Sequence, residues 1–274
     1  MLYVIDVGNW ALPLLYLALL IDYGATFFLR TRTHSRSPWL PAVVGAHAAY
    51  LVLRAIHQGQ PSLTTAQEIG SLVAWTLAAV YAVVEFTGRD RRSGVFVMLL
   101  VFLFQYTSSI FLAAGAGAAV GAAEAEGGWS RMHVLPAVVA YTALAFSAIY
   151  GVLYLAAQRG LRHHRFGVLF DRLPPLDLLG RMTWHALVIG FIFMTITIAT
   201  GPLMFAGGAA GGASPLATPK ILSKIITGSA AWIIYAAAIA GRLVGKWPPA
   251  RTAAIAAAGF VVVLALLAAS AILS

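Results

Sequence analysis

The sequence predicts an all-α protein: a polytopic transmembrane helix bundle of about eight spans, forming one integral membrane domain over residues 1–274. Three observations predict this fold. Of the 274 residues, 61% are hydrophobic and only 10% are charged, whereas a soluble domain carries about 25% charged residues. Apolar segments recur along the chain, and each is about 20 residues long, which is the length of helix that crosses a hydrocarbon core of about 30 Å. Basic residues alternate between successive loops, as they do in membrane proteins.

The predicted spans follow one another with short connections. The first lacks a basic segment before it, so it is predicted to be a retained span rather than a cleaved signal peptide. The later spans are separated by alternating basic loops and loops rich in Gly, Ala, Ser or Pro. The eight predicted spans are residues 9–29, 38–57, 65–87, 94–114, 132–157, 182–206, 221–241 and 252–273.

The loops predict the orientation. The first, third, fifth and seventh loops hold 14 of the 18 Lys and Arg residues. The positive-inside bias therefore places these loops in the cytoplasm and both termini outside, in a bacterial cytoplasmic membrane. Because topology accounts for the net charge of +9, we expect membrane lipids as partners and no nucleic acid.

The residue types also restrict the chemistry. The chain has no cysteine, which excludes disulfides, thiolate metal sites, cysteine nucleophiles and covalent haem attachment to this chain. It contains no HExxH, paired-carboxylate or Ser-His-Asp arrangement, so we predict that it is not an enzyme. A transporter would show matched broken spans in two halves, but Gly201-Pro202 is the one interruption of that kind.

Histidines at membrane depth are the main candidates for function, because ionisable groups in hydrocarbon are unfavourable. With the predicted topology, His57 and His133 lie near the outer boundary, and His47 lies about 15 Å deeper. Two neutral imidazoles from different helices can ligate a haem iron. His57 with His133 is one candidate pair, and His47 with His185 is a weaker one because their depths differ. The alternative for each is a hydrogen bond to a neighbouring helix.

The charged residues Glu68 and Arg54, in or near the predicted spans, can be explained without a functional role. Glu68 is consistent with a first-turn residue that complements the helix dipole. Arg54 is expected either to extend toward the outer interface or to pair with Glu68. Asp22 and Glu85 are the other acidic groups within predicted spans.

Four groups of residues then occur in a characteristic order. They are His57, Pro61, Glu68 and Trp75; Trp129, His133 and Tyr141; Leu173, Pro174, Asp177, Gly190, Phe191, Thr195 and Gly201; and Lys224, Trp232, Tyr235, Arg242, Gly259 and Phe260. They are similar to the motifs "H-x-P-x-x-N-x-x-E … W", "W-x-x-x-H-V … Y", "L-P-x-L-x-x-L-D" with "G-F-x-x-L-T-x-G-x-x-x-G", and "K … W-x-x-Y … R … G-F". These motifs belong to the CcsA/CcmC/HemX cytochrome c assembly proteins, and Lys220 is the alternative match to the family lysine.

The resemblance implies a haem-handling membrane protein of cytochrome c assembly or haem biogenesis. Such proteins present haem at the outer face to apocytochrome c. His133 corresponds to the family's first outward haem-ligating histidine, which makes haem the implied cofactor. His57 and His47 remain candidates from their predicted positions alone.

Three departures from the family pattern leave two interpretations of the protein open. The tryptophan-rich haem-presenting loop is absent between Gly201 and Lys224, the family's transmembrane histidine falls on Ala240, and residues 252–273 contain no histidine. These losses fit a divergent HemX-like branch. They also fit a non-catalytic structural subunit of a larger respiratory or assembly complex, which has kept the fold and lost the haem ligands.

Overall fold

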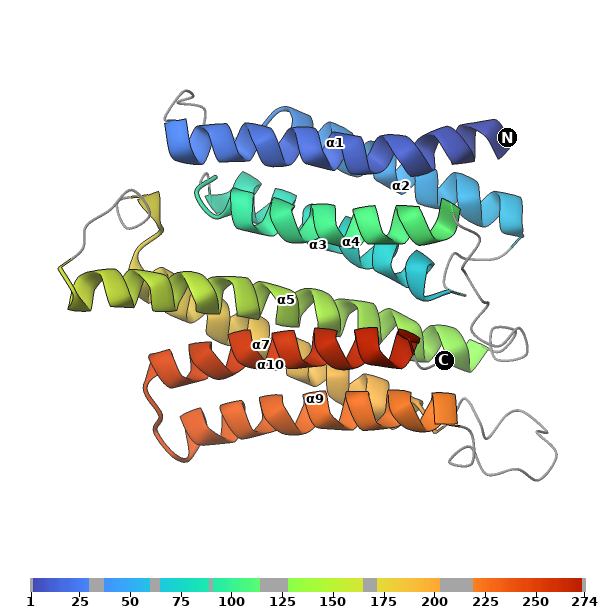
Figure 1. Cartoon of the computed structure of the whole chain (residues 1–274). Coiled ribbons are helices and arrows are strands. Elements are labelled where there is room, and N and C mark those ends of the chain that lie inside the picture. The colour runs from blue at the N-terminus through green and yellow to red at the C-terminus, as the bar shows by residue number, and fades with distance from the viewer. Residues whose placement is uncertain are drawn as a thin grey trace. The chain divides into compact units, whose positions relative to one another are not determined.

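The computed structural model describes residues 2–29, 37–59, 65–88, 91–113, 128–164, 172–202 and 219–272. Throughout these ranges the regular secondary structure is helical, as predicted (Figure 1). The helices are α1 (Leu2–Leu29), α2 (Trp39–Gln58), α3 (Ala66–Gly88), α4 (Gly94–Ala113), α5 (Gly128–Arg162), α7 (Leu176–Thr200), α9 (Pro219–Leu243) and α10 (Pro249–Ile272).

The predicted number of spans is confirmed: eight helices in the described ranges are long and apolar enough to cross a membrane. The predicted ends of three spans, at residues 114, 206 and 273, lie outside the described residues. The largest difference in length is α5, which has 35 residues instead of the predicted segment 132–157. At 1.5 Å per residue it is about 52 Å long, well beyond the hydrocarbon thickness. Arg159 and Arg162 lie in its last turn, where positive charge stabilises the carbonyl end of a helix. Hydropathy marks where a helix leaves hydrocarbon, and the backbone hydrogen bonds of α5 continue past that point.

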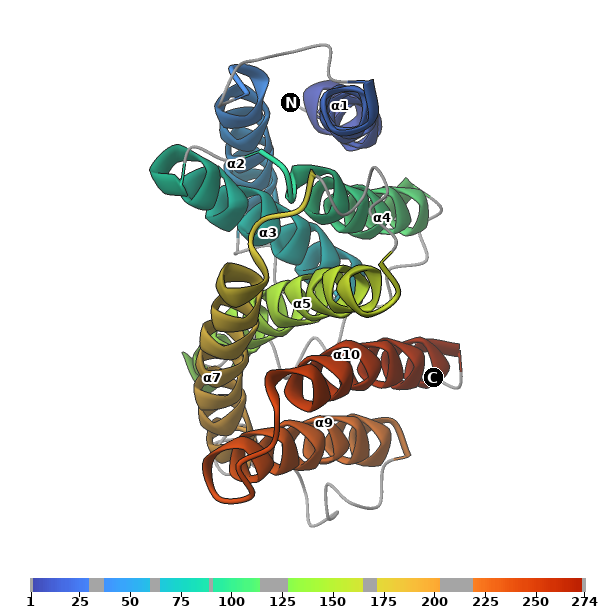
Figure 2. The same cartoon turned by 90° about the vertical axis from the view of Figure 1, so that its left-hand side faces the viewer.

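The chain divides into two compact units, unit 1 over Met1–Ala125 and unit 2 over Glu126–Ser274. In unit 1, α4 packs against α1 and α3, and α2 contacts both α1 and α3. In unit 2, α5 packs against α7 and α10, and α9 contacts α7 and α10 (Figure 2). The single membrane domain predicted for residues 1–274 stays a prediction.

Glycines allow the helices of unit 2 to approach closely along α5. A Cβ atom on Gly151 would lie 2.8 Å from the backbone oxygen of Ala253 in α10. A Cβ atom on Gly190 in α7 would lie 2.7 Å from the side chain of Leu144 in α5. Small residues at such crossings let helices pack in lipid, where no hydrophobic effect drives their association. These contacts fix α7 and α10 against α5.

Candidate functional site

His133 lies one turn into α5, at the predicted outer end of unit 2, where α7 ends. Its Nδ1 atom is 3.5 Å from Oγ1 of Thr200, the last residue of α7. A Cβ atom built on Gly201 would lie 3.5 Å from Cε1 and 3.7 Å from Nδ1 of the same ring. The Nδ1–Cε1 edge of the partly exposed imidazole therefore faces the last turn of α7.

The same part of unit 2 contains an aromatic and hydroxyl contact between α7 and α9. The Trp232 indole Nε1 donates a hydrogen bond to Thr195 Oγ1 at 3.0 Å. The Trp232 ring also lies against Phe191, with ring centroids 5.5 Å apart. Thr195 is five residues before Thr200, which is about 7.5 Å along the helix axis. Residues from the resembled motifs thus join α7 to both α5 and α9.

Tyr235, on α9, adds a buried polar atom to this unit. It is only 1% exposed, and its ring lies 3.6 Å from the Cβ position of Gly259 on α10. Its hydroxyl has no hydrogen-bond partner among the described residues. A buried hydroxyl without a partner is unfavourable, so this position is informative for mutagenesis.

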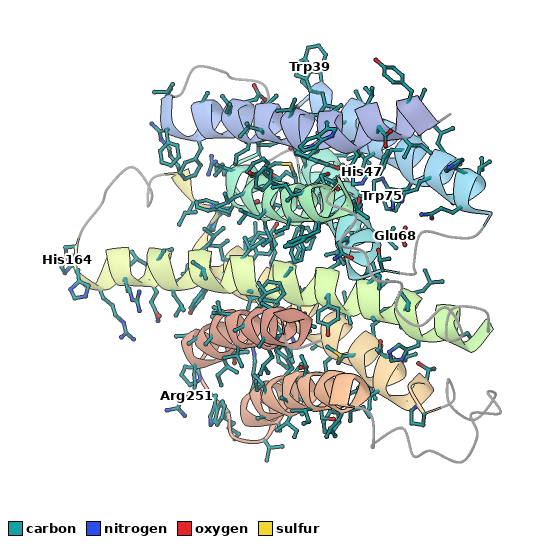
Figure 3. The ribbon with its side chains drawn as sticks, turned by 45° about the vertical axis from the view of Figure 1, so that its right-hand side comes forward. Trp39, His47, Glu68, Trp75, His164 and Arg251 are labelled. Carbon is teal, nitrogen blue, oxygen red and sulfur yellow. The ribbon has the colours of Figure 1, made fainter. Side chains whose placement is uncertain are left out.

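The other two predicted ligands lie on α2 in unit 1. His57 is in the last turn of α2 and its side chain is exposed. His47, which is labelled in Figure 3, is fully buried. Its Nδ1 and Nε2 atoms lie 2.9 Å from Tyr16 Oη and 3.0 Å from Ser71 Oγ, respectively. Iron binding at His47 would require one of these hydrogen bonds to break. The haem role of all three histidines, and the pairing of His57 with His133, stay predictions.

His185, the predicted weaker partner of His47, has an exposed side chain on α7. It is four residues after Arg181, a predicted cytoplasmic residue, so it lies about 6 Å further along the helix. Its pairing with His47 likewise stays a prediction.

A polar chain extends from His47 through the interior of unit 1. Ser71 Oγ donates to Gln105 Oε1 at 2.9 Å, and Gln105 Nε2 donates to Ser109 Oγ at 3.0 Å. With Tyr16, this chain connects all four helices of unit 1. The sequence interpretation missed Ser71, Gln105 and Ser109. The available signal was a set of polar residues inside otherwise apolar spans, which tend to bond across helices in lipid.

At the predicted outer end of unit 1, Glu68 accepts hydrogen bonds from two side chains of α2 and from the residue that precedes α3. It pairs with Arg54 at 3.1 Å and accepts a hydrogen bond from Gln58 at 2.8 Å. Thr65 and Glu68 also exchange backbone-to-side-chain hydrogen bonds, each 3.2 Å long, which form a capping box at the start of α3. Both the predicted first-turn position of Glu68 and its predicted pairing with Arg54 are confirmed.

Trp75, the second motif residue on α3, has a similar role. Its indole Nε1 donates to the backbone oxygen of Val44 in α2 at 3.1 Å. Figure 3 marks Glu68 and Trp75 in this unit. Since Glu68 and Trp75 both bond to α2, this part of the resembled motif anchors α3 to its neighbour.

The predicted cytoplasmic end of unit 1 holds the inner charge cluster, defined as Asp22, Glu85 and Arg91. Arg91 Nη2 lies 2.6 Å from Asp22 Oδ2, and Arg91 Nε lies 3.8 Å from Glu85 Oε1. Glu85 also accepts hydrogen bonds from the Tyr23 hydroxyl and the Ser37 backbone N–H. The sequence interpretation identified Asp22 and Glu85 separately, and it missed the guanidinium that joins them.

These observations define the class of the protein: an integral membrane protein built from helices, with buried polar contacts inside each helical unit. Comparison with known families then identifies it further. The model of the family described as "Cytochrome C assembly protein" matches residues 63–272, and the chain belongs to this family. The predicted family resemblance is confirmed. The match includes His133, Thr200 and Tyr235, whereas α1 and α2 precede it.

Several relatives are named "Cytochrome c biogenesis protein CcsA". The protein from Trieres chinensis is 21% identical over 93% of this chain and 90% of its own length. The one from Chlorella vulgaris is 23% identical over 78% of this chain and 75% of its own length. The match to the Guillardia theta protein is 27% identical, but it spans only 48% of that protein. No solved structure matches the chain.

Proposed function

We propose that this protein holds haem near the outer membrane face during cytochrome c assembly or haem biogenesis, with His133 as an axial ligand of the iron. The contact between His133 and the last turn of α7 is the observation that carries this proposal. It places an imidazole, the commonest axial ligand type, at the end of a helix bundle. Membership of the cytochrome c assembly family supports the same assignment.

The residues around His133 suit an axial ligand. An imidazole that binds a metal is usually oriented by a polar partner at its other ring nitrogen. The Thr200 hydroxyl, 3.5 Å from Nδ1 of His133, is a candidate for such a partner. The partial exposure of the ring at a helix start suits a ligand that is reached from the boundary of the bilayer.

The separate roles of this chain, haem and a partner protein follow from the chemistry of haem. Haem, when bound, supplies the reactive vinyl groups, and a partner such as apocytochrome c supplies the thiols. This chain has no cysteine, so its own contribution is to bind, orient and shield the cofactor. We therefore propose that it acts without catalytic residues, in a bacterial cytoplasmic membrane, as a HemX-like member of the family.

His57 and His47 enter this proposal differently. His57, with an exposed imidazole at the end of α2, stays a candidate ligand from its predicted position alone. His47 has hydrogen bonds at both ring nitrogens, so we rank it last of the three.

Titration of the purified full-length protein with haemin tests the proposal. We expect a Soret band typical of histidine-ligated haem that saturates at a fixed stoichiometry. His133→Ala should abolish this band or shift its position, and His57→Ala should change the low-spin fraction. His163→Ala serves as the matched control, because that exposed histidine directly follows the opposite end of α5. A His133→Ala spectrum identical to that of the unaltered protein would refute the proposal.

A structural subunit of a larger membrane complex is the second candidate function. It is favoured by the absence of tryptophan between Gly201 and Lys224 and of histidine in 252–273, where the resembled family carries its other haem contacts. Membrane subunits of a respiratory or assembly complex are then the expected partners. Copurification at fixed stoichiometry with such a complex, together with no haem binding by the full-length protein, would support this function over the first.

A further inference from the structure

We propose that the turn between α9 and α10, at the predicted cytoplasmic end of unit 2, binds the phosphate group of an anionic phospholipid. Three basic residues lie at this turn. Arg242 is in the last turn of α9, Lys246 lies between the helices, and Arg251 is in the first turn of α10. These three residues, with Trp184 and Trp247, are called the inner arginine–tryptophan site below. The proposal is independent of haem binding.

The cations of this site have no counter-ion among the described residues of unit 2. Residues 178–274 contain no Asp or Glu, and Asp177 is the one carboxylate side chain in the described part of the unit. Asp177 pairs with Arg181 of its own helix, at 3.4 Å. A positive cluster without carboxylates suits an anionic ligand, and lipid headgroups are the anions that concentrate at the cytoplasmic surface of a membrane.

Two tryptophan rings hold the guanidinium groups of the site. Cζ of Arg242 lies 4.5 Å from the centroid of the Trp184 ring on α7. Cζ of Arg251 lies 5.1 Å from the centroid of the Trp247 ring. A ring contacts the flat face of a guanidinium. The N–H fork at the edge of the group then stays available to donate two parallel hydrogen bonds to phosphate oxygens.

The backbone of the turn brings Trp247 back onto α9. The Trp247 N–H donates to the backbone oxygen of Gly241 at 3.0 Å, and a Cβ atom on Gly241 would lie 2.3 Å from the Trp247 ring. Lys246, between them, has a φ of 48°, a left-handed conformation that ends many helices and favours glycine. A lysine at this strained position adds the third cation of the site, which a role in anion binding explains.

Apolar side chains beside the turn suit the acyl chains of a lipid. Leu243 and Val244 directly follow Arg242, and both are exposed. Cations next to exposed apolar side chains match the boundary between headgroups and hydrocarbon. This combination favours a phospholipid over a free phosphate ion, which has no acyl chain to cover Leu243 and Val244.

Native mass spectrometry of the delipidated full-length protein in detergent tests the proposal. The probes are phosphatidylglycerol and phosphatidylcholine with the same acyl chains, and we expect tighter binding of phosphatidylglycerol. Arg242→Gln combined with Arg251→Gln should weaken this binding by about 25-fold, since one basic residue near an anionic membrane surface contributes about fivefold. Lys246→Gly should weaken it by about fivefold. Its unfolding midpoint should stay the same or rise, because glycine relieves the left-handed strain.

Arg159→Gln combined with Arg162→Gln is the matched control for charge. These substitutions remove two exposed cations from the last turn of α5. The labels of His164 and Arg251 in Figure 3 show that this end of α5 and the start of α10 lie toward the same end of unit 2. The control should leave phosphatidylglycerol binding unchanged. Equal losses in the two double variants would overturn the proposal, because binding would then follow the general surface charge.

Gly241→Ala tests the shape of the site at constant charge. The added Cβ displaces the Trp247 ring, so we expect weaker binding of phosphatidylglycerol. Gly228→Ala on the same helix, whose Cβ position has no atom within 4 Å, should bind as the unaltered protein does. Trp247→Leu removes the ring directly and supplies the same measurement if Gly241→Ala does not fold.

Three further results would overturn the proposal. The first is unchanged binding in both Gly241→Ala and Trp247→Leu. The second is equal affinity of the unaltered protein for the two phospholipids. The third is displacement of phosphatidylglycerol by inorganic phosphate at the same concentration, which would show that the site takes free phosphate instead of a lipid.

Discussion

Replacing His47 with leucine removes a buried side chain that bonds to two other helices. The change abolishes the 2.9 Å contact with Tyr16 and the 3.0 Å contact with Ser71. Ser71 keeps Gln105 as its acceptor and therefore loses only an incoming donor. Tyr16 is fully buried, and its hydroxyl would lose the acceptor at Nδ1.

The expected loss of unfolding free energy follows from the unequal effects of the substitution on Ser71 and Tyr16. Inter-helix hydrogen bonds in membranes are worth about 0.6 kcal/mol each on average. A buried hydroxyl left without an acceptor adds about 1–3 kcal/mol. We therefore expect His47→Leu to destabilise the protein by about 2–4 kcal/mol. Tyr16→Phe removes the stranded hydroxyl, so the double variant should be less destabilised than the sum of the two single variants, by about 1–2 kcal/mol.

Equilibrium unfolding in mixed micelles of sodium dodecyl sulfate and a mild detergent measures these free energies for the four members of the cycle. Haemin titration of the same samples tests the alternative role of His47. Additive effects of the two substitutions would refute the inferred Tyr16–His47 hydrogen bond. Loss of the Soret band in His47→Leu, with unfolding free energy unchanged, would show that His47 is a ligand and not a structural residue.

Three further substitutions test the packing and charge of the two units. Arg91→Ala should destabilise the protein by about 3–5 kcal/mol, because it leaves two carboxylates of the inner charge cluster without their guanidinium; the yield of folded protein and its unfolding midpoint in mixed micelles measure this. Gly151→Ala should lower the unfolding free energy by about 1–3 kcal/mol, because its Cβ would lie 2.8 Å from the backbone oxygen of Ala253. Gly228→Ala is the control, because its Cβ position has no atom within 4 Å. Equal unfolding free energies for the two variants would contradict the expectation. Tyr235→Phe removes a buried hydroxyl without a partner among the described residues, so it should leave stability unchanged or raise it by about 1 kcal/mol; a clear loss of stability would show that this hydroxyl makes a favourable contact.

The predictions that succeeded from sequence depend on local properties. An apolar stretch of about 20 residues is long enough to specify a membrane-spanning helix, and the described ranges contain eight such helices. The family motifs are likewise read in order along the chain, and the family match over residues 63–272 confirms them. The first-turn position of Glu68 is also local, because it depends only on where α3 begins.

The sequence by itself determined that this chain is a helical membrane protein of the cytochrome c assembly family, and it singled out His133. Only the tertiary structure decided which polar groups meet. It gave His47 two hydrogen-bonded partners from other helices and joined Asp22 to Glu85 through Arg91. It also placed Thr200 against His133, 67 residues away in sequence. The physical reason is that hydropathy specifies the length of a span, whereas the partner of each polar side chain depends on the rotation and depth of the helix that faces it.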